Sequence, residues 1–322
     1  MRHLFVLDPL DRLHTESDSS IVFVREAWRR GDTVETCEIG DLGQRDGVPF
    51  ARAAVTTAGD GGSRWCATER PRRVDLSAYD VVWMRKDPPF DSAYLFATLL
   101  MSRAVGPAGG PVMVNDPRTL RDENEKLFAL EFPELCPTTL VSRSIDELLA
   151  FRDELGGEMV VKPLDGAGGH GVFHVTRGDR NARAILETGT RNGTALLMAQ
   201  RYVPQVRQGD KRILMIEGEP LGALLRVPAD DDARANLHVG GRAARAELTA
   251  RDREICARIG PTLREKGVIL AGIDVLGDHL TEINITSPTG FREIERLGGG
   301  ALEVPLLDAV ASRRRGSGRA TS

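Results

Sequence analysis

A glycine-rich turn between two apolar segments is a first candidate for binding chemistry. Met159–Val161 leads into Lys162, and the apolar segment Val172–Val175 follows the turn. Because a strand-like segment follows the last glycine, the pattern is strand–loop–strand, not the strand–helix unit of dinucleotide-binding folds. Backbone amides of such a loop can close over phosphate oxygens, and Lys162 adds a positive charge. The stretch indicates a phosphate site, and the alternative is an ordinary hairpin beside a solvated lysine.

A second candidate lies near the C-terminal end, in two strand-like segments. Glu282 and Asn284 are two residues apart and therefore share one face of a strand, while Asp274 lies on the preceding strand. A three-residue turn would place Asp274 opposite Glu282, and a two-residue turn would place it opposite Thr281. Carboxylate and amide oxygens are ligands that Mg²⁺ takes together with nucleotide phosphates. The alternative is the polar face of an amphipathic hairpin.

A pair of basic residues follows a buried strand in the first half of the chain. Arg85 and Lys86 come directly after Val81–Met84. Ligands of open α/β sheets gather at the carboxyl ends of the strands. The pair therefore suits a substrate carboxylate, and a surface salt bridge is the alternative.

The overall composition limits the class of protein. The chain has 322 residues, 41% of them hydrophobic and 28% charged, with a net charge of −4. These values are typical of a globular protein of two or three domains without a broad basic surface for nucleic acid. The four cysteines form no C-x-x-C pair, no apolar run approaches the roughly 18 residues of a membrane-spanning helix, and the N-terminus is no signal peptide. We expect a cytoplasmic protein with reduced thiols.

The elements that must position these residues begin with a β-α-β unit, which predicts a parallel sheet. The apolar pattern predicts strands at 4–7 and 33–39, with a helix from about residue 18 to residue 30 between them. Residues 40–78 read as a short hairpin and a surface excursion. A strand at 81–84, a helix at 91–105 and a strand at 112–114 complete an N-terminal domain that we expect to end near residue 121.

The second half reads as strands in antiparallel pairs, with helices between some of them. Strands are predicted at 138–141, 195–199, 210–216, 221–227, 268–276 and 280–286, and helices at 144–155, 179–188, 249–266, 290–296 and 301–311. The long helix should be interrupted or kinked at Gly260-Pro261. Residues 228–242 have no core pattern and read as a functional or disordered loop. The tail 312–322 is predicted to be disordered.

Six motifs occur in order over nearly the whole chain. They are MRKDPPFD (84–91), NEKLF (124–128), KPLDGAGG (162–169), GDKR (209–212), NLHVGGR (236–242) and TEINITSPTG (281–290). Together they resemble prokaryotic glutathione synthetase, a ligase of the ATP-grasp superfamily. The resemblance implies a parallel-sheet α/β domain (1–121), a two-lobed ATP-grasp domain with mixed and antiparallel sheets (122–311), a lid at 228–242 and a disordered tail (312–322).

The resemblance also implies the roles of individual residues. ATP would contact Lys126, Lys162, Asp165, Gly166, Gly168, Gly169, Gln200, Tyr202, Val203, Asp210 and Lys211. Asp274, Glu282 and Asn284 would hold two Mg²⁺ or Mn²⁺ ions. Arg212 and Arg226 would face the reacting groups, as would the lid residues Arg234, Asn236 and Arg242. The dipeptide would lie at Ser19, Ser20 and Arg85, and Ser287, Pro288, Thr289, Gly290 and Arg292 would help to hold substrate and glycine.

The implied reaction joins γ-glutamylcysteine to glycine through an acyl phosphate, with small molecules as partners and a homotetramer as the assembly. It needs no side-chain nucleophile, and the sequence has no Ser/His/Asp or Cys/His arrangement. No residue is identified as the base for the amine; a leaving phosphate oxygen or a lid residue could serve. One alternative is a paralogous ligase with another donor or amine, because His238 lies in the lid where a small residue is expected. The other is a nucleotide-binding protein without catalysis.

Overall fold

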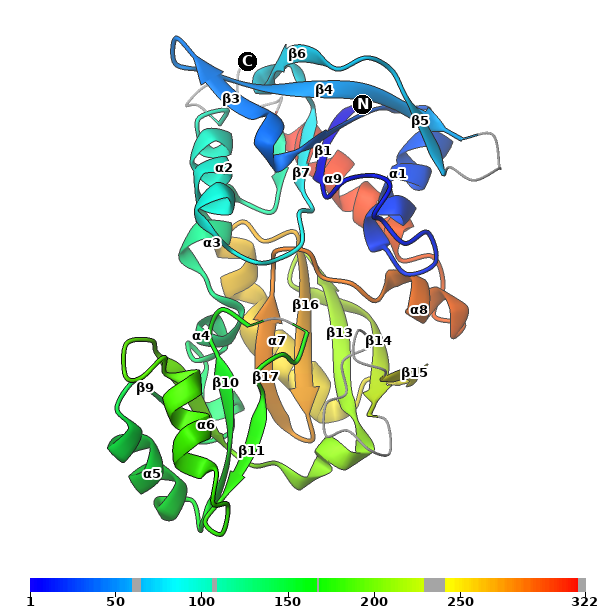
Figure 1. The fold of residues 1–322 in the computed structure, drawn as a ribbon. Coiled ribbons are helices and arrows are strands. Elements are labelled where there is room, and N and C mark those ends of the chain that lie inside the picture. The colour runs from blue at the N-terminus through cyan, green and yellow to red at the C-terminus, as the bar shows by residue number, and fades with distance from the viewer. Residues whose placement is uncertain (60–64, 106–108, 167, 229–240, 318–322) are drawn as a thin grey trace.

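The computed structural model describes residues 1–59, 65–105, 109–166, 168–228 and 241–317. The chain forms three sheets, and the sheet that comes last in the sequence lies between the other two in space (Figure 1). The N-terminal sheet is at the top, the sheet formed within residues 210–284 is in the middle, and the sheet formed within residues 139–201 is at the lower left. The predicted class, a parallel-sheet α/β unit followed by mixed and antiparallel sheets, is confirmed.

The N-terminal sheet is built on parallel strands in the order β2-β1-β7-β8. The apolar side chains of β1 and β7 are all fully buried, which explains why these strands read as unbroken hydrophobic runs. The elements are β1 (Arg2–Leu7), α1 (Ser19–Arg29), β2 (Thr33–Glu38), β7 (Val81–Met84), α2 (Ser92–Ser102), β8 (Val112–Val114) and α3 (Pro117–Asp122).

The segment 40–78 is more regular than the predicted hairpin and excursion. It forms β3 (Leu42–Arg45), β4 (Val48–Ala58), β5 (Cys66–Thr68) and β6 (Arg72–Asp75). β4 pairs antiparallel with β2 and extends the sheet to eight strands. Alternate residues of β4 such as Ala51 and Ala53 are fully buried. The polar composition of the segment concealed a one-sided pattern of small buried residues.

The sheet of β9 to β12 is antiparallel and carries the glycine loop. Its order is β11-β10-β12-β9, and its small core lies against two helices. The elements are α4 (Glu125–Ala129), which precedes it, β9 (Thr139–Ser142), α5 (Ile145–Glu154), β10 (Glu158–Pro163), β11 (Phe173–Thr176), α6 (Ala182–Gly189) and β12 (Leu197–Arg201). The glycine loop is the connection from β10 to β11, as the sequence predicts.

The middle sheet has the order β15-β14-β13-β16-β17 and is antiparallel throughout. Its elements are β13 (Asp210–Ile216), β14 (Glu219–Val227), β15 (Arg242–Arg245), α7 (Ala250–Glu265), β16 (Leu270–Leu276) and β17 (His279–Asn284). The interruption expected at Gly260-Pro261 is wrong, because α7 includes Pro261. Gly260 has a packing role instead: a Cβ there would lie 2.3 Å from the carbonyl oxygen of Gly218.

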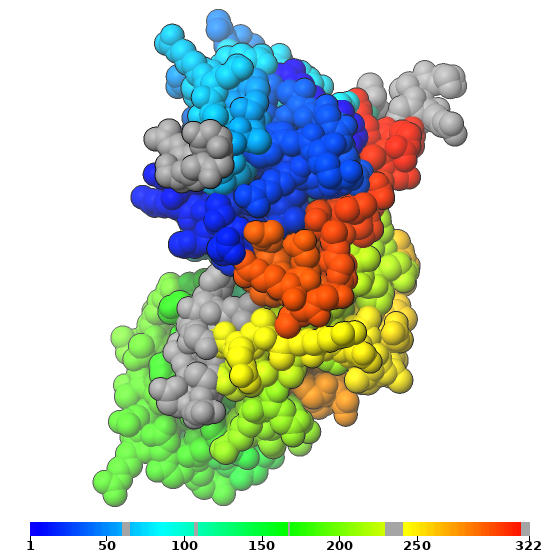
Figure 2. Space-filling view, turned by 90° about the vertical axis from the view of Figure 1, so that its right-hand side faces the viewer, coloured from blue at the N-terminus to red at the C-terminus, as the bar shows by residue number. Residues whose placement is uncertain are grey.

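The end of the chain returns to the N-terminal sheet. After α8 (Phe291–Arg296), α9 (Glu303–Ser317) packs against α1, where Arg30 pairs with Asp308 at 2.8 Å. Figure 2 shows the red C-terminal residues against the blue N-terminal ones. The predicted disorder of 312–322 is therefore wrong for 312–317. Arg313 forms two 2.6 Å hydrogen bonds with Glu217, and Arg314 donates to Asp80 at 2.9 Å.

Candidate active site

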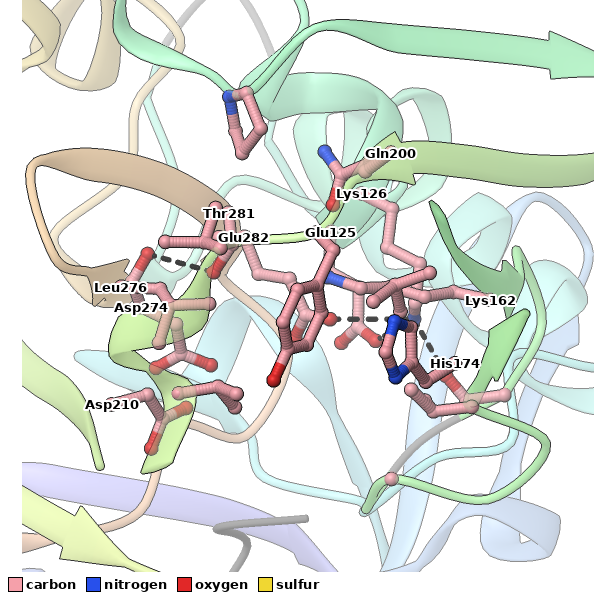
Figure 3. Close-up of a pocket in the computed structure, with 18 of the residues that line it drawn as sticks. Glu125, Lys126, Lys162, His174, Gln200, Asp210, Asp274, Leu276, Thr281 and Glu282 are labelled. Carbon is pink, nitrogen blue, oxygen red and sulfur yellow. Dashed lines mark hydrogen bonds and ion pairs between the residues drawn. The ribbon is translucent and has the colours of Figure 1, made fainter. Parts of the chain in front are cut away.

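Two adjoining cavities border the middle sheet, and the first lies where this sheet faces the sheet of β9 to β12. The first is lined by α4, the glycine loop, β10, β12, the segment after β12, and the facing ends of β13, β14, β16 and β17. The second is lined mainly by the chain after β17 and by β13, β14 and the segment after β7. Figure 3 shows Lys162 and His174 on one side of the first cavity, with Asp210 and Asp274 on the other.

Positive charge in the first cavity comes from two lysines beside the glycine loop. Lys126 Nζ donates to Glu125 Oε1 at 2.5 Å and to the carbonyl oxygen of Gly166 at 2.6 Å. Burial disfavours its charge, but the Glu282 and Glu125 carboxylates hold the pKa of Lys126 above its ordinary value. Lys162, at the end of β10, also lines the cavity. Lys126, Lys162 and glycines of the loop thus line the same cavity, and cations and backbone amides are the groups that bind phosphate in proteins.

The far end of the first cavity is apolar and aromatic. Tyr202 and Val203 line it, and the Tyr202 ring stacks on His174 with centroids 4.1 Å apart and 13° between the planes. Gln200 is buried on β12 and donates to Thr139 Oγ1 at 3.0 Å. A flat heteroaromatic ring would find both a stacking surface and an amide here.

Two of the residues implied for ATP lie elsewhere. Asp165 is exposed and pairs with Arg191 at 2.7 Å, outside both cavity linings. Lys211 points to the opposite face of β13, where it pairs with the buried Asp252 of α7. Since strand side chains alternate between faces, Asp210 can face the cavity only if Lys211 does not.

The acidic face of the site depends on the β16–β17 register. Leu276 pairs with His279 across a two-residue turn, yet Asp274 lies opposite Glu282 because the register shifts between Asp274 and Val275. The extra residue is Thr281, whose hydroxyl donates to the Asp274 carbonyl oxygen at 3.0 Å. The hairpin therefore has the two-residue turn but also the pairing of Asp274 with Glu282 that was expected only with a three-residue turn. The bulge makes this combination possible.

A network of two carboxylates and two guanidinium groups lies below this face. Asp274 accepts from Arg212 Nε at 2.5 Å and pairs with Arg226 at 3.0 Å. Arg226 also donates to Asp210 at 2.8 Å. Burial alone would raise the pKa of Asp274, but Arg212 and Arg226 hold it well below the ordinary value. Asp274 is thus ionised, and both of its oxygens are engaged.

The donor set fits a hard divalent cation bound together with phosphate. Burial raises the pKa of Glu125, and the nearby Glu282 carboxylate adds to this increase. Within the described part of the chain, no three Asp, Glu, His or Cys side chains come close enough to hold a metal by themselves. Glu282 and Asn284, which line the second cavity, would supply oxygens alongside those of a nucleotide.

The turn after β17 forms one wall of the second cavity. Ser287, Pro288, Thr289 and Gly290 all line it. Behind this wall, Arg85 donates from Nη2 to the Pro288 carbonyl at 3.1 Å and from Nε to Ser20 Oγ at 3.1 Å. Its Nη1 and the hydroxyl of Ser19 are buried and have no hydrogen-bond partner among the described residues. Burial lowers the pKa of the Arg85 guanidinium. These unmet donors fit a carboxylate, although none of the three residues lines the cavity as it stands.

Of the remaining implied residues, the two that the structure describes are not brought to the site. Arg292 donates to the Thr15 carbonyl at 3.0 Å and lines neither cavity. Arg242 is exposed at the start of β15 and also lines neither. Arg234 and Asn236, with most of the expected lid, lie outside the described residues.

Sequence reasoning missed Glu125, His170 and His174, which line the first cavity. Each lies within or next to a segment that the sequence already marked: Glu125 precedes Lys126, His170 is in the glycine loop, and His174 follows it. Their position next to residues of the recognised motifs was the signal that could have identified these three residues.

The structure is similar to those of ATP-grasp proteins. The crystal structure of D-cycloserine synthetase DcsG has a TM-score of 0.65 at 17% identity, covering 98% of this chain and 100% of that one. A RimK domain ATP-grasp protein from Sphaerobacter thermophilus DSM 20745 has a TM-score of 0.61 at 19% identity, covering 97% and 100%. These similarities confirm the fold.

Comparison of sequences goes further. The chain is 46% identical over 318 residues to a glutathione synthetase from Gloeobacter violaceus, with 98% of each chain covered. It is 44% identical to the glutathione synthetase of Agrobacterium fabrum, with 96% of this chain and 95% of that one covered. Residues 1–121 match the model of the prokaryotic glutathione synthetase N-terminal domain, and residues 125–299 match that of its ATP-grasp domain. The chain therefore belongs to the prokaryotic glutathione synthetase family and is an enzyme, a carbon–nitrogen ligase of the ATP-grasp type.

Proposed function

We propose that this enzyme joins γ-glutamylcysteine to glycine with ATP, giving glutathione, ADP and phosphate. The observation that supports this best is the match to glutathione synthetases over 96 to 98% of the chain. The two adjoining cavities are consistent with it, because one has the features of a nucleotide site and the other borders unmet donors for a carboxylate.

The chemistry follows from the charges around the first cavity. The γ-phosphoryl group transfers in line to the dipeptide carboxylate, and the protein positions the groups and neutralises charge. Lys126, Lys162 and the amides of Gly166, Gly168 and Gly169 hold the phosphates. Arg226, which lines both cavities, faces the phosphoryl group during its transfer. Arg212, which lines the second cavity, supports the same step.

Nucleotide recognition falls to the aromatic end of the cavity. The adenine stacks at Tyr202 and contacts Val203 and Gln200, and Asp210 lies toward the ribose and phosphates. A divalent metal works with ATP in this family, and we assign Mg²⁺ or Mn²⁺, as two ions, to Asp274, Glu282 and Asn284. Such ions neutralise the phosphates and polarise the reacting phosphoryl group.

Substrate binding uses the second cavity. Arg85, with Ser19 and Ser20, binds a carboxylate of γ-glutamylcysteine. This requires the backbone at Pro288, which separates Arg85 from the cavity, to move aside. The turn Ser287–Gly290 orients the dipeptide and glycine. A lid at 228–242, with Arg234, Asn236 and Arg242, excludes water from the acyl phosphate, which would otherwise hydrolyse.

The wider organisation is part of the same proposal. We divide the chain at about residue 121, between substrate-binding and ATP-grasp domains, and assign a cytoplasmic homotetramer that acts on small molecules without nucleic acid or membrane partners. In the described part of the chain, no helix has the length and apolar character to cross a bilayer.

A phosphate-release assay with mass detection of the product tests the proposal. Phosphate release that requires ATP, Mg²⁺, γ-glutamylcysteine and glycine, with glutathione as the product, is the expected result. Release that needs the dipeptide but yields no glycine adduct would point to a different amine. An enzyme that binds ATP but releases no phosphate with these substrates would overturn the assignment.

A further inference from the structure

Residues 286–290, the substrate turn, form the wall of the second cavity that follows β17. All five residues line this cavity, and these described residues do not line the first one. The turn also folds back over the middle sheet, because a Cβ built on Gly272 of β16 would lie 2.9 Å from Pro288 Cβ. The place of the turn therefore decides the shape of the second cavity. That this cavity binds the dipeptide rests on the proposed function.

The N-terminal sheet holds the substrate turn at two points. Its strands β7 and β8 are parallel neighbours, and Arg85 and Asn115 directly follow them. Both residues therefore leave the sheet at the same edge. Arg85 donates from Nη2 to the Pro288 carbonyl, within the turn, at 3.1 Å. Asn115 acts at the root of the turn, where its Nδ2 donates to the Ile285 carbonyl at 2.6 Å.

The Asn115 side chain makes four hydrogen bonds at this root. Besides the bond to Ile285, its Nδ2 donates to the Leu270 carbonyl at 2.7 Å. Its Oδ1 accepts from the backbone amides of Ile269 and Leu270 at 2.8 and 2.9 Å. Asn115 is 2% exposed, so these bonds are shielded from water. A buried amide group with both of its hydrogens and both acceptor positions paired is held in one orientation.

These bonds join β16 to the chain just beyond the end of β17, where the pairing of the two strands stops. The final β16–β17 pair is Gly272 with Asn284, and Ile285 is the next residue. Asn115 connects Ile285 to Leu270 through one side chain. The entry to the substrate turn is therefore fixed from the N-terminal sheet and not by strand pairing alone.

We propose that Asn115 is a positioning residue for substrate binding, which sets the affinity for γ-glutamylcysteine by fixing the root of the substrate turn. With the root fixed, only the backbone around Pro288 has to adjust when Arg85 exchanges that carbonyl for a substrate carboxylate. The nucleotide end of the first cavity is built by β10, the glycine loop and β12. The hydrogen bonds of Asn115 go instead to residues 269, 270 and 285. Dipeptide binding should therefore depend on Asn115, and ATP binding should not.

Two variants of Asn115 test this role. Asn115→Asp keeps an acceptor for the two amides and loses both donors, whereas Asn115→Ala loses all four bonds. Both variants should raise the KM for γ-glutamylcysteine at least about tenfold, because a displaced wall binds the dipeptide poorly. The KM for ATP should stay within about twofold of the wild type. Urea unfolding at the assay pH gives the stability of each variant, since buried groups left without partners lower it.

Thr119→Val is the matched control. Thr119 lies on α3, which follows β8, and its Oγ1 donates to the carbonyl of Lys266 at the end of α7. The variant loses a hydrogen bond between the N-terminal segment and the middle sheet region but leaves the substrate turn held. It should lower stability and keep both KM values within about twofold of the wild type.

The two KM values separate positioning from a purely structural role. Asn115 variants that lose stability but keep the wild-type KM for the dipeptide would overturn the proposal. An equal rise of both KM values would also overturn it, because a general loosening of the fold has no preference for one substrate. A wild type that forms no glutathione would contradict the proposed function instead.

Discussion

Arg212 and Asp274 face each other across neighbouring strands and share two hydrogen bonds. Arg212 Nε and Nη2 donate to the two Asp274 oxygens at 2.5 and 3.0 Å, and the residues are paired in the β13–β16 register. Asp274 is 3% exposed and Arg212 7%. The carboxylate thus balances buried positive charge and also lines the first cavity, so we expect its removal to affect both stability and activity.

Removing this carboxylate should therefore damage the fold and not only the activity. Asp274→Ala leaves Arg212 and Arg226 buried without their shared partner, which costs about 3–5 kcal/mol. We expect the free energy of unfolding, measured in urea at pH 7.5, to fall by about that amount while turnover is lost. A variant with wild-type stability would show that Asp274 has no structural role.

Glu282 offers the matched comparison, because its carboxylate faces the cavity without such a network. Its side chain is 21% exposed, and its ion partner, Lys126, lies 4.0 Å away. Glu282→Ala should abolish turnover, weaken Mn²⁺ binding by at least about tenfold, and shift the free energy of unfolding by less than about 1 kcal/mol. Near-normal kcat would remove Glu282 from the metal site.

The comparison of these two residues shows what the sequence could predict. The spacing of Glu282 and Asn284 placed them on one strand face, and the apolar pattern placed both strands. The pairing of Asp274 with Glu282 depended on a bulge at Thr281, and no local pattern indicates such a bulge. The capture of Asp274 by two arginines is a long-range contact, which periodicity cannot predict either.

Because side chains alternate between the two faces of β13, the structure predicts a role for Lys211 that differs from the ATP contact implied by the family resemblance. Lys211 pairs with Asp252, which also accepts from the Thr249 amide at 2.7 Å. Lys211→Met should lower the free energy of unfolding by about 1–3 kcal/mol, because Asp252 is left buried with fewer partners. The KM for ATP should stay within about twofold of the wild type, whereas Lys162→Met should raise it by more than about tenfold. A large rise in the Lys211 variant would place its ammonium on the nucleotide.

The prediction of disorder was wrong for residues 312–317 because an arginine-rich segment is typical of a solvated tail. The partners of these arginines, Glu217 and Asp80, are distant in sequence and carry no local signal. Deleting residues 313–322 should lower the free energy of unfolding by about 1 kcal/mol through the loss of two partly exposed ion pairs. Deletion of 318–322 is the control and should leave stability unchanged. Equal stability of the two truncations would show that the ion pairs contribute nothing.

Stability should also fall in mild acid because of His3. This side chain is fully buried, its Nδ1 accepts from Trp83 Nε1 at 3.0 Å, and its Nε2 lies 3.1 Å from Asp32. Burial lowers the pKa of His3, and the Asp32 carboxylate opposes the shift only in part. As the pH falls below about 6.5, the unfolded chain takes up a proton that the folded protein does not.

The free energy of unfolding should therefore decrease from pH 7.5 to pH 5.5, by up to about 1.4 kcal/mol per pH unit below the unfolded pKa for this one group. His3→Asn retains an acceptor for Trp83 and cannot titrate, so it should be less stable at pH 7.5 but show a shallower slope against pH. The other histidines are the same in both proteins and cancel in the comparison. Parallel slopes for the two proteins would show that His3 titrates equally in the folded and unfolded states.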